Sequence, residues 1–426
     1  MTGKWNYLPL TQKEQLIETE LAKRFASVPP VSQLLVERGV TSVEEADRFL
    51  HPQLKNLHNP FLLPDMDKAV ERLNRAMGSK EKIMVYGDYD VDGTTAVALV
   101  YKYLQNFYSN IDYFIPTRYE EGYGISSETI DDFARQGVKL VIILDCGIKA
   151  NVEIAHAREH GIDFIICDHH VPDDELPQAV AILNPKMPGS TYPCPHLSGC
   201  GVGYKLMQAF SISNGIPQAD LEGMLDLVAV SIAADIVPMV DENRVMTFYG
   251  LRRLNSNPNM GLRAIIRICG LTGKEITISD VIFKIGPRIN ASGRMQSGRE
   301  AVDLLVSRDI TDAYQKARNI DQYNKDRKEL DRRITEEANA ILSQRIEAGS
   351  NKKSIVIFNK DWHKGIIGIV ASRLTELYYK PSVVLTLSNG LATGSSRSVQ
   401  GFDIYAAVDS TRDLLENFGG HTYAVG

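Results

Sequence analysis

The chain has few of the features that would place it in a membrane or outside the cell. Within its 426 residues no apolar stretch approaches the length of a membrane span, and the N-terminus lacks the basic-then-apolar pattern of a signal peptide. It has only five cysteines, an odd number that disulfide pairing would leave incomplete. Cys146 and Cys167 lie in apolar, strand-like runs and are expected to be small core residues. These absences predict a cytoplasmic protein in a reducing compartment, without membrane segments.

An excess of positive charge, internal repeats and low-complexity tracts are also missing. The formal net charge is −6, which gives no electrostatic signature of a general nucleic-acid binder. Nucleic acid is not excluded, because bound divalent ions would offset buried aspartates and local arginine clusters matter more than the sum. Cys194, His196 and Cys200 could suggest zinc, but no second ligand pair follows at finger-like spacing, so a structural loop is expected there.

A dense acidic motif follows an apolar run that ends at Val85. Asp88, Asp90 and Asp92 stand at alternate positions before Gly93 breaks the run. Three carboxylates this close repel one another, so stability alone would not select them. An acidic surface turn explains one or two of them, but not a cluster at the carboxyl end of a strand, where open α/β sheets bind ligands. The motif therefore predicts a hard divalent metal with oxygen ligands.

The order of the expected elements predicts an α/β fold. Strands alternate with helices from about Lys82, which favours a doubly wound, mostly parallel sheet with right-handed crossovers. A long, charged, helix-periodic stretch is expected to join it to a second, smaller α/β domain, with its charges on a solvated face. Expected strands are 82–86, 111–116, 140–144, 163–167, 180–183, 355–358 and 382–387, and expected helices include 94–107, 127–136, 151–160, one from Tyr204, 221–234 and 366–379. The predicted domains are an N-terminal helical region (1–75), a catalytic domain (76–308), a connecting helix (309–347) and a second domain (348–426) that is incomplete at its C-terminus.

Two further apolar strands also end in acids. Asp145 follows one of them, and Asp168 follows the next, together with His169 and His170. Because parallel strands bring their carboxyl ends to one edge of a sheet, these side chains should converge with the first acidic motif, and Asp235 at the end of a buried helix is a further candidate. Four carboxylates and an imidazole can hold two metals about 3.5–4 Å apart. Oxygen-rich ligation with one nitrogen suits Mn²⁺ or Mg²⁺ better than zinc or copper. The structural alternatives are that Asp145 caps a helix and that Asp168 only orients His169.

Residues 87–93, 145–147, 168–170 and 234–235 resemble, in order, the four motifs of the DHH phosphoesterase superfamily. The wider sequence resembles its RecJ family of single-strand-specific 5′→3′ DNA exonucleases, through residues 116–124, 289–295, 362–368 and 394–398. The closing segment 419–421 resembles the start of the last glycine-rich motif of the DHHA1 domain. The resemblance thus implies a DHH domain and a DHHA1 domain, and a fragment cut inside the latter. Relatives of RecJ length usually continue into an OB-fold domain.

This resemblance implies roles for single residues. The implied metal ligands are Asp90, Asp92, Asp145, His169 and Asp235, with Asp145 as the bridge. The implied catalytic residues are His170 and Arg294 at the scissile phosphate and Asp88 in support of the ligands. The implied substrate-binding residues are Arg118, Ser395 and Arg397 at the 5′-terminal phosphate, together with His421 and Asn290. Tyr86 departs from the pattern, because some members carry a histidine ligand there, and the first metal would keep an open position.

The family also implies two Mn²⁺ or Mg²⁺ ions, single-stranded DNA as substrate, a role in DNA repair and recombination, and a monomer that works with a helicase and a single-strand-binding protein. Two other functions remain open. Small DHH–DHHA1 phosphodiesterases cleave short oligoribonucleotides or cyclic dinucleotides, but they tend to be shorter and lack the N-terminal helices and the connector. A non-catalytic replication scaffold should show broken aspartates or a missing histidine pair, and both are intact here.

Overall fold

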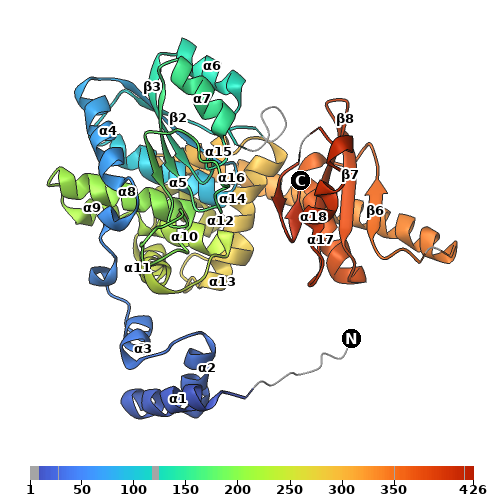
Figure 1. The fold of residues 1–426 in the computed structure, drawn as a ribbon, viewed down its shortest axis with the longest axis horizontal. Helices are drawn as coiled ribbons and strands as arrows, with labels where there is room; N and C mark the ends of the chain where they lie inside the picture. The colour runs from blue at the N-terminus through green and yellow to red at the C-terminus, as the bar shows by residue number, and fades with distance from the viewer. Residues whose placement is uncertain (1–8, 27, 118–123, 350, 417) are drawn as a thin grey trace.

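The computed structural model describes residues 9–26, 28–117, 124–349, 351–416 and 418–426. Figure 1 shows two α/β domains side by side, with a small group of helices from the N-terminal region below the larger one. Each domain is built on one five-stranded sheet. This confirms the predicted fold class, a mostly parallel sheet joined by a long helix to a second, smaller α/β domain. None of the described helices is long and apolar enough to cross a membrane.

The sheet of the larger domain has the strand order β2-β1-β3-β4-β5, and every neighbouring pair is parallel. Its strands are almost continuously apolar because helices cover both faces. The order reverses at β1, which pairs with β2 on one side and with β3 on the other. Open α/β sheets bind ligands beyond the carboxyl ends of the strands at such a reversal. The strands are β1 (Lys82–Gly87), β2 (Ile111–Phe114), β3 (Val138–Leu144), β4 (Asp163–Cys167) and β5 (Ala181–Leu183).

Alternate side chains of β1 show how the two faces are covered. Ile83 and Val85 belong to the large core shared with α4, α5, α8 and α10. Met84 and Tyr86 face the smaller core under α6 and α7. The sheet is therefore enclosed on both sides, and its carboxyl edge is left to carry polar groups. The helices of this part are α4 (Met66–Gly78), α5 (Val91–Leu104), α6 (Ser127–Arg135), α7 (Asn151–Glu159), α8 (Gly199–Ser213), α9 (Gln218–Glu222), α10 (Leu225–Asp235) and α11 (Asp241–Ser256).

Three helices differ from the sequence expectation at their ends. The α5 helix begins about one turn early, because the side chain of Asp90 accepts the N–H of Gly93 and caps it. The α8 helix begins at Gly199, capped by Ser198, so the glycine-rich segment is helical. The apolar stretch expected as one helix over 221–234 is divided by a turn near Gly223 into α9 and α10.

The N-terminal helices form a small core of their own, made by Leu21, Leu35, Val36, Val40 and Ala46. Figure 1 shows this group apart from the sheet of the larger domain. One link is α11, where Arg244 donates from Nε to the carbonyl oxygen of Phe49 at 3.2 Å and lies over its ring. The helices are α1 (Gln12–Phe25), α2 (Pro29–Glu37) and α3 (Val43–Leu50).

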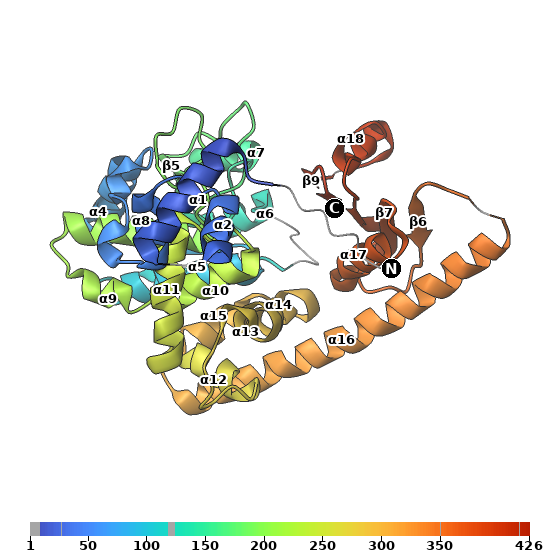
Figure 2. The same ribbon diagram turned by 90° about the horizontal axis from the view of Figure 1, so that it is seen from below.

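The α16 helix (Ile310–Glu347) runs from one domain to the other, as Figure 2 shows most clearly. Its first half contributes Ala313, Ala317 and Ile320 to the core of the larger domain. Its second half contributes Ile334 and Ala338 to the core of the second domain. Most charged residues of α16 are exposed, as predicted. Asp321 and Asp331 are buried, and the carboxylate of Asp331 accepts a hydrogen bond from Arg373 Nη2 at 2.8 Å. Before α16 come α12 (Met260–Ile268), α13 (Ile278–Asp280), α14 (Gly286–Met295) and α15 (Arg299–Leu305).

The second domain has the strand order β6-β7-β8-β10-β9, in which only β6 and β7 pair in parallel. Helix α17 packs on this sheet and against α16, through Ile366, Ile367 and Val370. The elements are β6 (Ile355–Phe358), α17 (Lys364–Tyr378), β7 (Ser382–Ser388), β8 (Leu391–Arg397), α18 (Ile404–Asp409), β9 (Gly420–His421) and β10 (Ala424–Val425).

Candidate metal centre

The turn from β1 into α5 carries the first acidic motif. Asp88 is buried, and a Cβ on Gly93 would lie 2.4 Å from its carbonyl oxygen, so only glycine fits where the turn closes on itself. Asp90 caps α5, and Asp92 lies in the first helical turn. Asn290 of α14 accepts the N–H of Val91 at 3.1 Å, which ties this turn to a helix far along the chain. The acidic turn of residues 88–93 is therefore held both by its own close packing and by α14.

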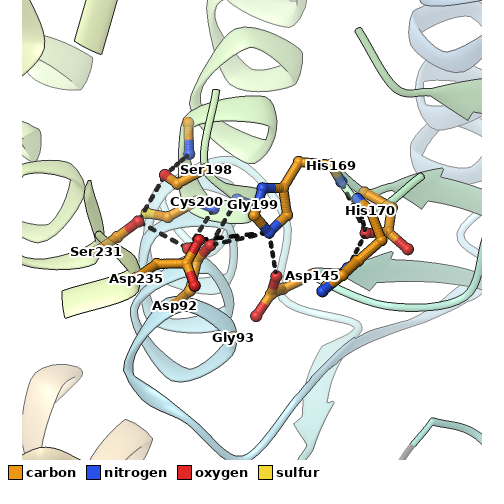
Figure 3. Close-up of polar contacts among 12 residues, drawn as sticks. Asp92, Gly93, Asp145, His169, His170, Ser198, Gly199, Cys200, Ser231 and Asp235 are labelled. Carbon is orange, nitrogen blue, oxygen red and sulfur yellow. Dashed lines mark hydrogen bonds and ion pairs between the residues drawn. The ribbon is translucent and has the colours of Figure 1, made fainter. Parts of the chain in front are cut away.

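Asp92 is held more firmly than a free surface carboxylate would be. Its Oδ2 accepts the N–H of Gly199 at 2.7 Å, and its Oδ1 accepts the N–H of Cys200 at 2.8 Å. The hydroxyl of Ser231 donates to the same Oδ1 at 2.7 Å and lies 2.6 Å from the hydroxyl of Ser198. Figure 3 shows this arrangement at the N-terminus of α8. These donors fix the orientation of Asp92, because each oxygen already has a directed partner.

Asp145 follows β3 in a backbone conformation that non-glycine residues seldom adopt, with φ of 61°. It is 3% exposed, and Gly199 lies directly against it, so that a Cβ there would come within 2.8 Å of Asp145 Oδ1. Left-handed backbone geometry outside turns is often found at functional sites. The close approach of α8 explains why this helix starts with glycine.

The segment after β4 places two histidines in different roles. The carboxylate of Asp168 accepts the backbone N–H groups of His169, His170 and Ile148 and lies 2.7 Å from Nδ1 of His170. Burial alone would raise the pKa of Asp168, but these bonds lower it to about 2. His170 is about half exposed, and although burial opposes it, the contact with Asp168 raises its pKa. His169 is buried, and burial lowers its pKa, which favours the neutral imidazole that metals bind.

Side chains from the ends of two strands, β3 and β4, and from two helices, α5 and α10, meet at Nε2 of His169. This nitrogen lies 3.1 Å from Asp145 Oδ1, 3.6 Å from Asp235 Oδ2 and 3.7 Å from Asp92 Oδ2. Figure 3 shows the four side chains pointing toward one another. On the other side of Asp145, ligand atoms of Asp88, Asp90 and Asp145 lie within 4.8 Å of one another. The predicted convergence at the carboxyl edge of the sheet is confirmed.

The electrostatics of this cluster call for a cation. Burial, together with the neighbouring carboxylates, raises the pKa of Asp145 well above its usual range and raises that of Asp90. The same causes raise the pKa of Asp235 to about 8. Carboxylates packed this way repel one another, and the fold offers no Lys or Arg ion pair to Asp90, Asp92, Asp145 or Asp235 within its described residues. Oxygen-rich groups of three ligands with a neutral imidazole fit hard divalent ions.

The predicted substrate residues lie on the other elements that border this edge. Arg294 of α14 donates from Nη1 to the carbonyl oxygen of Gly365 at the start of α17, so it lies where the domains meet. Arg397 and Ser395 lie together on β8, with Arg397 Nη1 3.1 Å from Ser395 Oγ. A Cβ on Gly368 of α17 would lie 3.0 Å from that hydroxyl.

His421 is exposed on β9, and its Nδ1 accepts the N–H of Tyr423 at 3.3 Å. The side-chain oxygen of Asn290 accepts the N–H of Val91, so Asn290 helps to hold the acidic turn of residues 88–93. Arg118 falls outside the described residues. Its predicted role at the 5′-phosphate therefore stays a prediction.

Tyr86 packs in the smaller core under α6 and α7. It is fully buried, stacks on Phe114, and donates from its hydroxyl to the carbonyl oxygen of Gly124. Cys194 and Cys200 are buried, and among the described residues neither belongs to a group of side chains that could hold a metal.

Sequence reasoning missed Gly199 and Ser231, which donate to Asp92, and Ser198, whose hydroxyl contacts that of Ser231. Gly199 also lies against Asp145. The signal for Gly199 was present in the glycine-rich segment 199–203, which does not match the spacing of a dinucleotide-binding fold. Close backbone approach to a neighbour is the other common reason for such glycines. Ser231 gave no signal, because a serine in an apolar helix is usually a packing residue.

Comparison with known proteins gives the same assignment for both domains. A family model of the DHH family, N-terminal domain, matches residues 82–232, and a model of the DHHA1 domain matches residues 351–426. The single-stranded-DNA-specific exonuclease RecJ of Salmonella typhimurium is 34% identical, with 96% of this chain and 73% of that protein covered. RecJ of Bacillus subtilis is 39% identical over 95% of this chain, which spans 51% of that relative.

Solved structures agree with the sequence matches. RecJ of Thermus thermophilus in complex with Mn²⁺ has a TM-score of 0.83 at 28% identity, covering 97% of this chain and 58% of that one. An exonuclease RecJ bound to manganese has a TM-score of 0.76 at 30% identity, covering 88% and 91% of the two chains. This chain thus spans about half to three quarters of the full-length relatives above.

Proposed function

This chain belongs to the RecJ family, and we propose that it is a metal-dependent exonuclease that hydrolyses single-stranded DNA from the 5′ end to 5′-mononucleotides, in DNA repair and recombination. The observation that carries the proposal is the cluster of buried carboxylates around His169 at the carboxyl edge of the sheet. It supports hydrolysis of a phosphodiester, since that substrate is anionic and must be neutralised before a nucleophile can approach.

The ligand groups support two metal positions that share one carboxylate. Asp88, Asp90 and Asp145 make one group, and Asp92, His169 and Asp235 make the other. Asp145 Oδ1 also lies near His169, so this carboxylate would bridge the two positions. Two Mn²⁺ or Mg²⁺ ions held there would supply charge neutralisation at the phosphate and at the leaving 3′ oxygen. Because Asp92 is oriented by three donors, it would hold its position without reorganisation during the reaction.

The residues around the centre would bind and orient the DNA. Asp168 orients the half-exposed ring of His170 through Nδ1, and His170 would contact the scissile phosphate. Arg294, where α14 meets α17, would bind the same phosphate with the fork geometry that lysine lacks. Asp88 would support the ligands, because it is buried within the first group.

The second domain would set the polarity of digestion. We assign four units to this protein: an N-terminal helical region (1–75), a catalytic domain (76–308), a connecting helix (309–347) and a second domain (348–426). The DNA would lie between the catalytic domain and the second domain. Ser395 and Arg397, which lie side by side at Gly368, would bind a 5′-terminal phosphate, and Arg118 would complete this site. His421 and Asn290 would border the strand from opposite domains.

We also propose that the protein acts as a monomer in the cytoplasm, with a helicase and a single-strand-binding protein supplying and protecting its substrate. All five cysteines are free, which supports a reducing compartment. The partners follow from the proposed chemistry, because an enzyme restricted to single strands needs a duplex to be opened first.

The deciding experiment is a Mn²⁺-dependent digestion of long single-stranded DNA labelled separately at its 5′ and 3′ ends. Duplex DNA, short RNA and the Asp145→Ala variant serve as controls. Stepwise release from the 5′ end of the single strand alone is the expected result. Cleavage confined to oligonucleotides of a few residues would favour the small phosphodiesterases instead. No cleavage by a folded preparation that also fails to bind Mn²⁺ would favour the non-catalytic scaffold.

A further inference from the structure

A second cluster of potential metal ligands lies outside the catalytic edge. It consists of Asp131 on α6 and of His156 and His160 on α7, and one ligand atom from each lies within 4.8 Å of the other two. His156 Nε2 is 2.7 Å and His160 Nε2 is 3.4 Å from the same oxygen, Oδ1 of Asp131. The two imidazole rings meet edge to face with centroids 4.7 Å apart.

The two helices bring these atoms together by simple geometry. Residues four apart lie on one face of a helix, so His156 and His160 both point toward α6. Figure 1 shows α6 and α7 packed beside each other on the sheet. The three side chains are between 29% and 43% exposed, so an ion can reach them from solvent. Ligand atoms bound to one ion at about 2.0–2.2 Å lie about 3.3 Å apart, which the rings could reach by small rotations.

The donor set differs in kind from that of the catalytic centre. Two imidazole nitrogens and one carboxylate suit zinc and the neighbouring transition ions, whereas Mg²⁺ and Mn²⁺ prefer oxygen. We propose that Asp131, His156 and His160 form a separate site for a transition-metal ion of the zinc type, with the remaining position open to water.

The surroundings of the site leave its carboxylate available. Arg135 lies one turn after Asp131, but its guanidinium pairs with Asp132 at 3.4 Å. The hydrogen bond from His156 lowers the pKa of Asp131, so the carboxylate is ionised at neutral pH. No lysine or arginine within the described residues makes an ion pair with Asp131.

The position of the site suggests what the ion does. Helix α7 runs from the catalytic edge back toward the start of β4, and His160 is its C-terminal cap, just before Asp163. The site therefore lies toward the opposite edge of the sheet from the catalytic centre. An ion there joins α6 to α7, the pair of helices that covers β3 and the smaller core. It would stabilise this layer without taking part in hydrolysis.

The proposal is tested by measuring zinc binding to the whole chain, by equilibrium dialysis and by the change in Tm that zinc produces. Excess Mg²⁺ is present to occupy the oxygen-rich centre. His156→Ala and His160→Ala should each remove one equivalent of zinc and the matching rise in Tm. Asp131→Asn keeps an acceptor for His156 but removes the charge, and it should weaken zinc binding at this site by at least about tenfold. His51→Ala is the matched control, because His51 makes an equivalent contact with Asp47 four residues away, and neither belongs to a three-ligand group among the described residues.

The outcomes separate a metal site from a plain contact between helices. A contact alone predicts that His156→Ala lowers Tm in chelator and leaves the zinc content unchanged, and that result would overturn the proposal. The same zinc loss in His51→Ala would also overturn it. Mn²⁺-dependent hydrolysis should be unchanged in His160→Ala. Because zinc binding and Tm are measured without DNA, the zinc result does not depend on whether the proposed exonuclease activity is found.

Discussion

Replacing Gly199 with alanine is expected to weaken metal binding without unfolding the chain. The new Cβ would lie 2.6 Å from Cβ and 2.8 Å from Oδ1 of Asp145, and contacts under 3.0 Å require something to move. Asp145 has little freedom to move, because it is 3% exposed and its backbone is in a left-handed conformation. The carboxylate must therefore turn away from His169, or the start of α8 must withdraw from Asp92.

The size of the effect follows from two opposing terms. Alanine improves helix propensity over glycine by up to about 1 kcal/mol, and overpacking a tight site costs about 1–3 kcal/mol. The free energy of unfolding should thus fall by no more than about 2–3 kcal/mol. Metal binding should suffer more, because displacing the groups that orient metal ligands typically lowers affinity about 10–100-fold.

The assay is a Mn²⁺ titration by calorimetry, with hydrolysis of single-stranded DNA measured over the same range of Mn²⁺. Two other glycines of α8 serve as matched controls. At Gly201 a Cβ would lie 3.3 Å from Ser198 Oγ, and at Gly203 it would lie 3.0 Å from a methyl group of Leu144. Both alanine variants should bind Mn²⁺ nearly as well as the unchanged chain. A folded Gly199→Ala variant with unchanged Mn²⁺ affinity would refute the reasoning.

The remaining predictions concern the centre, the substrate and the fold. Asp145→Ala or His169→Ala should abolish hydrolysis while far-UV circular dichroism stays native, because each removes a proposed metal ligand; residual nuclease activity in either purified variant would contradict the metal assignment. Arg397→Ala should reduce the preference for a 5′-phosphate over a 5′-hydroxyl more than it slows cleavage, and equal losses on both ends would argue against its role. Lys205→Met should cost about 3–5 kcal/mol in urea unfolding, since it leaves the carboxylate of Glu242 buried without the cation that lies 2.8 Å away; a change under about 1 kcal/mol would show that the pair is dispensable.

The sequence was most informative where the residues that determine a local structure lie close together in the chain. Asp90 and Asp145 each follow an apolar strand, and parallel strands place such residues on one edge whatever the rest of the chain does. Gly93 closes its turn on Asp88, which lies five residues away, so local spacing was enough to indicate it. Strand positions were predicted well for the same reason, because burial on both faces gives continuous apolar runs.

What could not be predicted depends on helices that approach from far along the chain. Ser231 reaches Asp92 across 139 positions, and nothing in its own neighbourhood in the sequence marks it. The start of α5 was also missed. Asp90 was interpreted only as a candidate metal ligand, although its side chain also caps this helix. The pairing of His156 with Asp131 required knowing that α6 and α7 pack side by side.

The α16 helix fixes more than the distance between the domains. Ile320 belongs to one core and Ile334 to the other, so the helix between them sets both a spacing of ~20 Å and a rotation. One inserted residue would advance the second domain by about 1.5 Å and turn it by about 100°, which would break the contact between Arg294 and Gly365. Insertions of about seven or eleven residues nearly complete whole turns and keep the direction. The length of this helix can therefore change in evolution only in steps that restore its phase, even though most of its surface is exposed and free to vary in sequence.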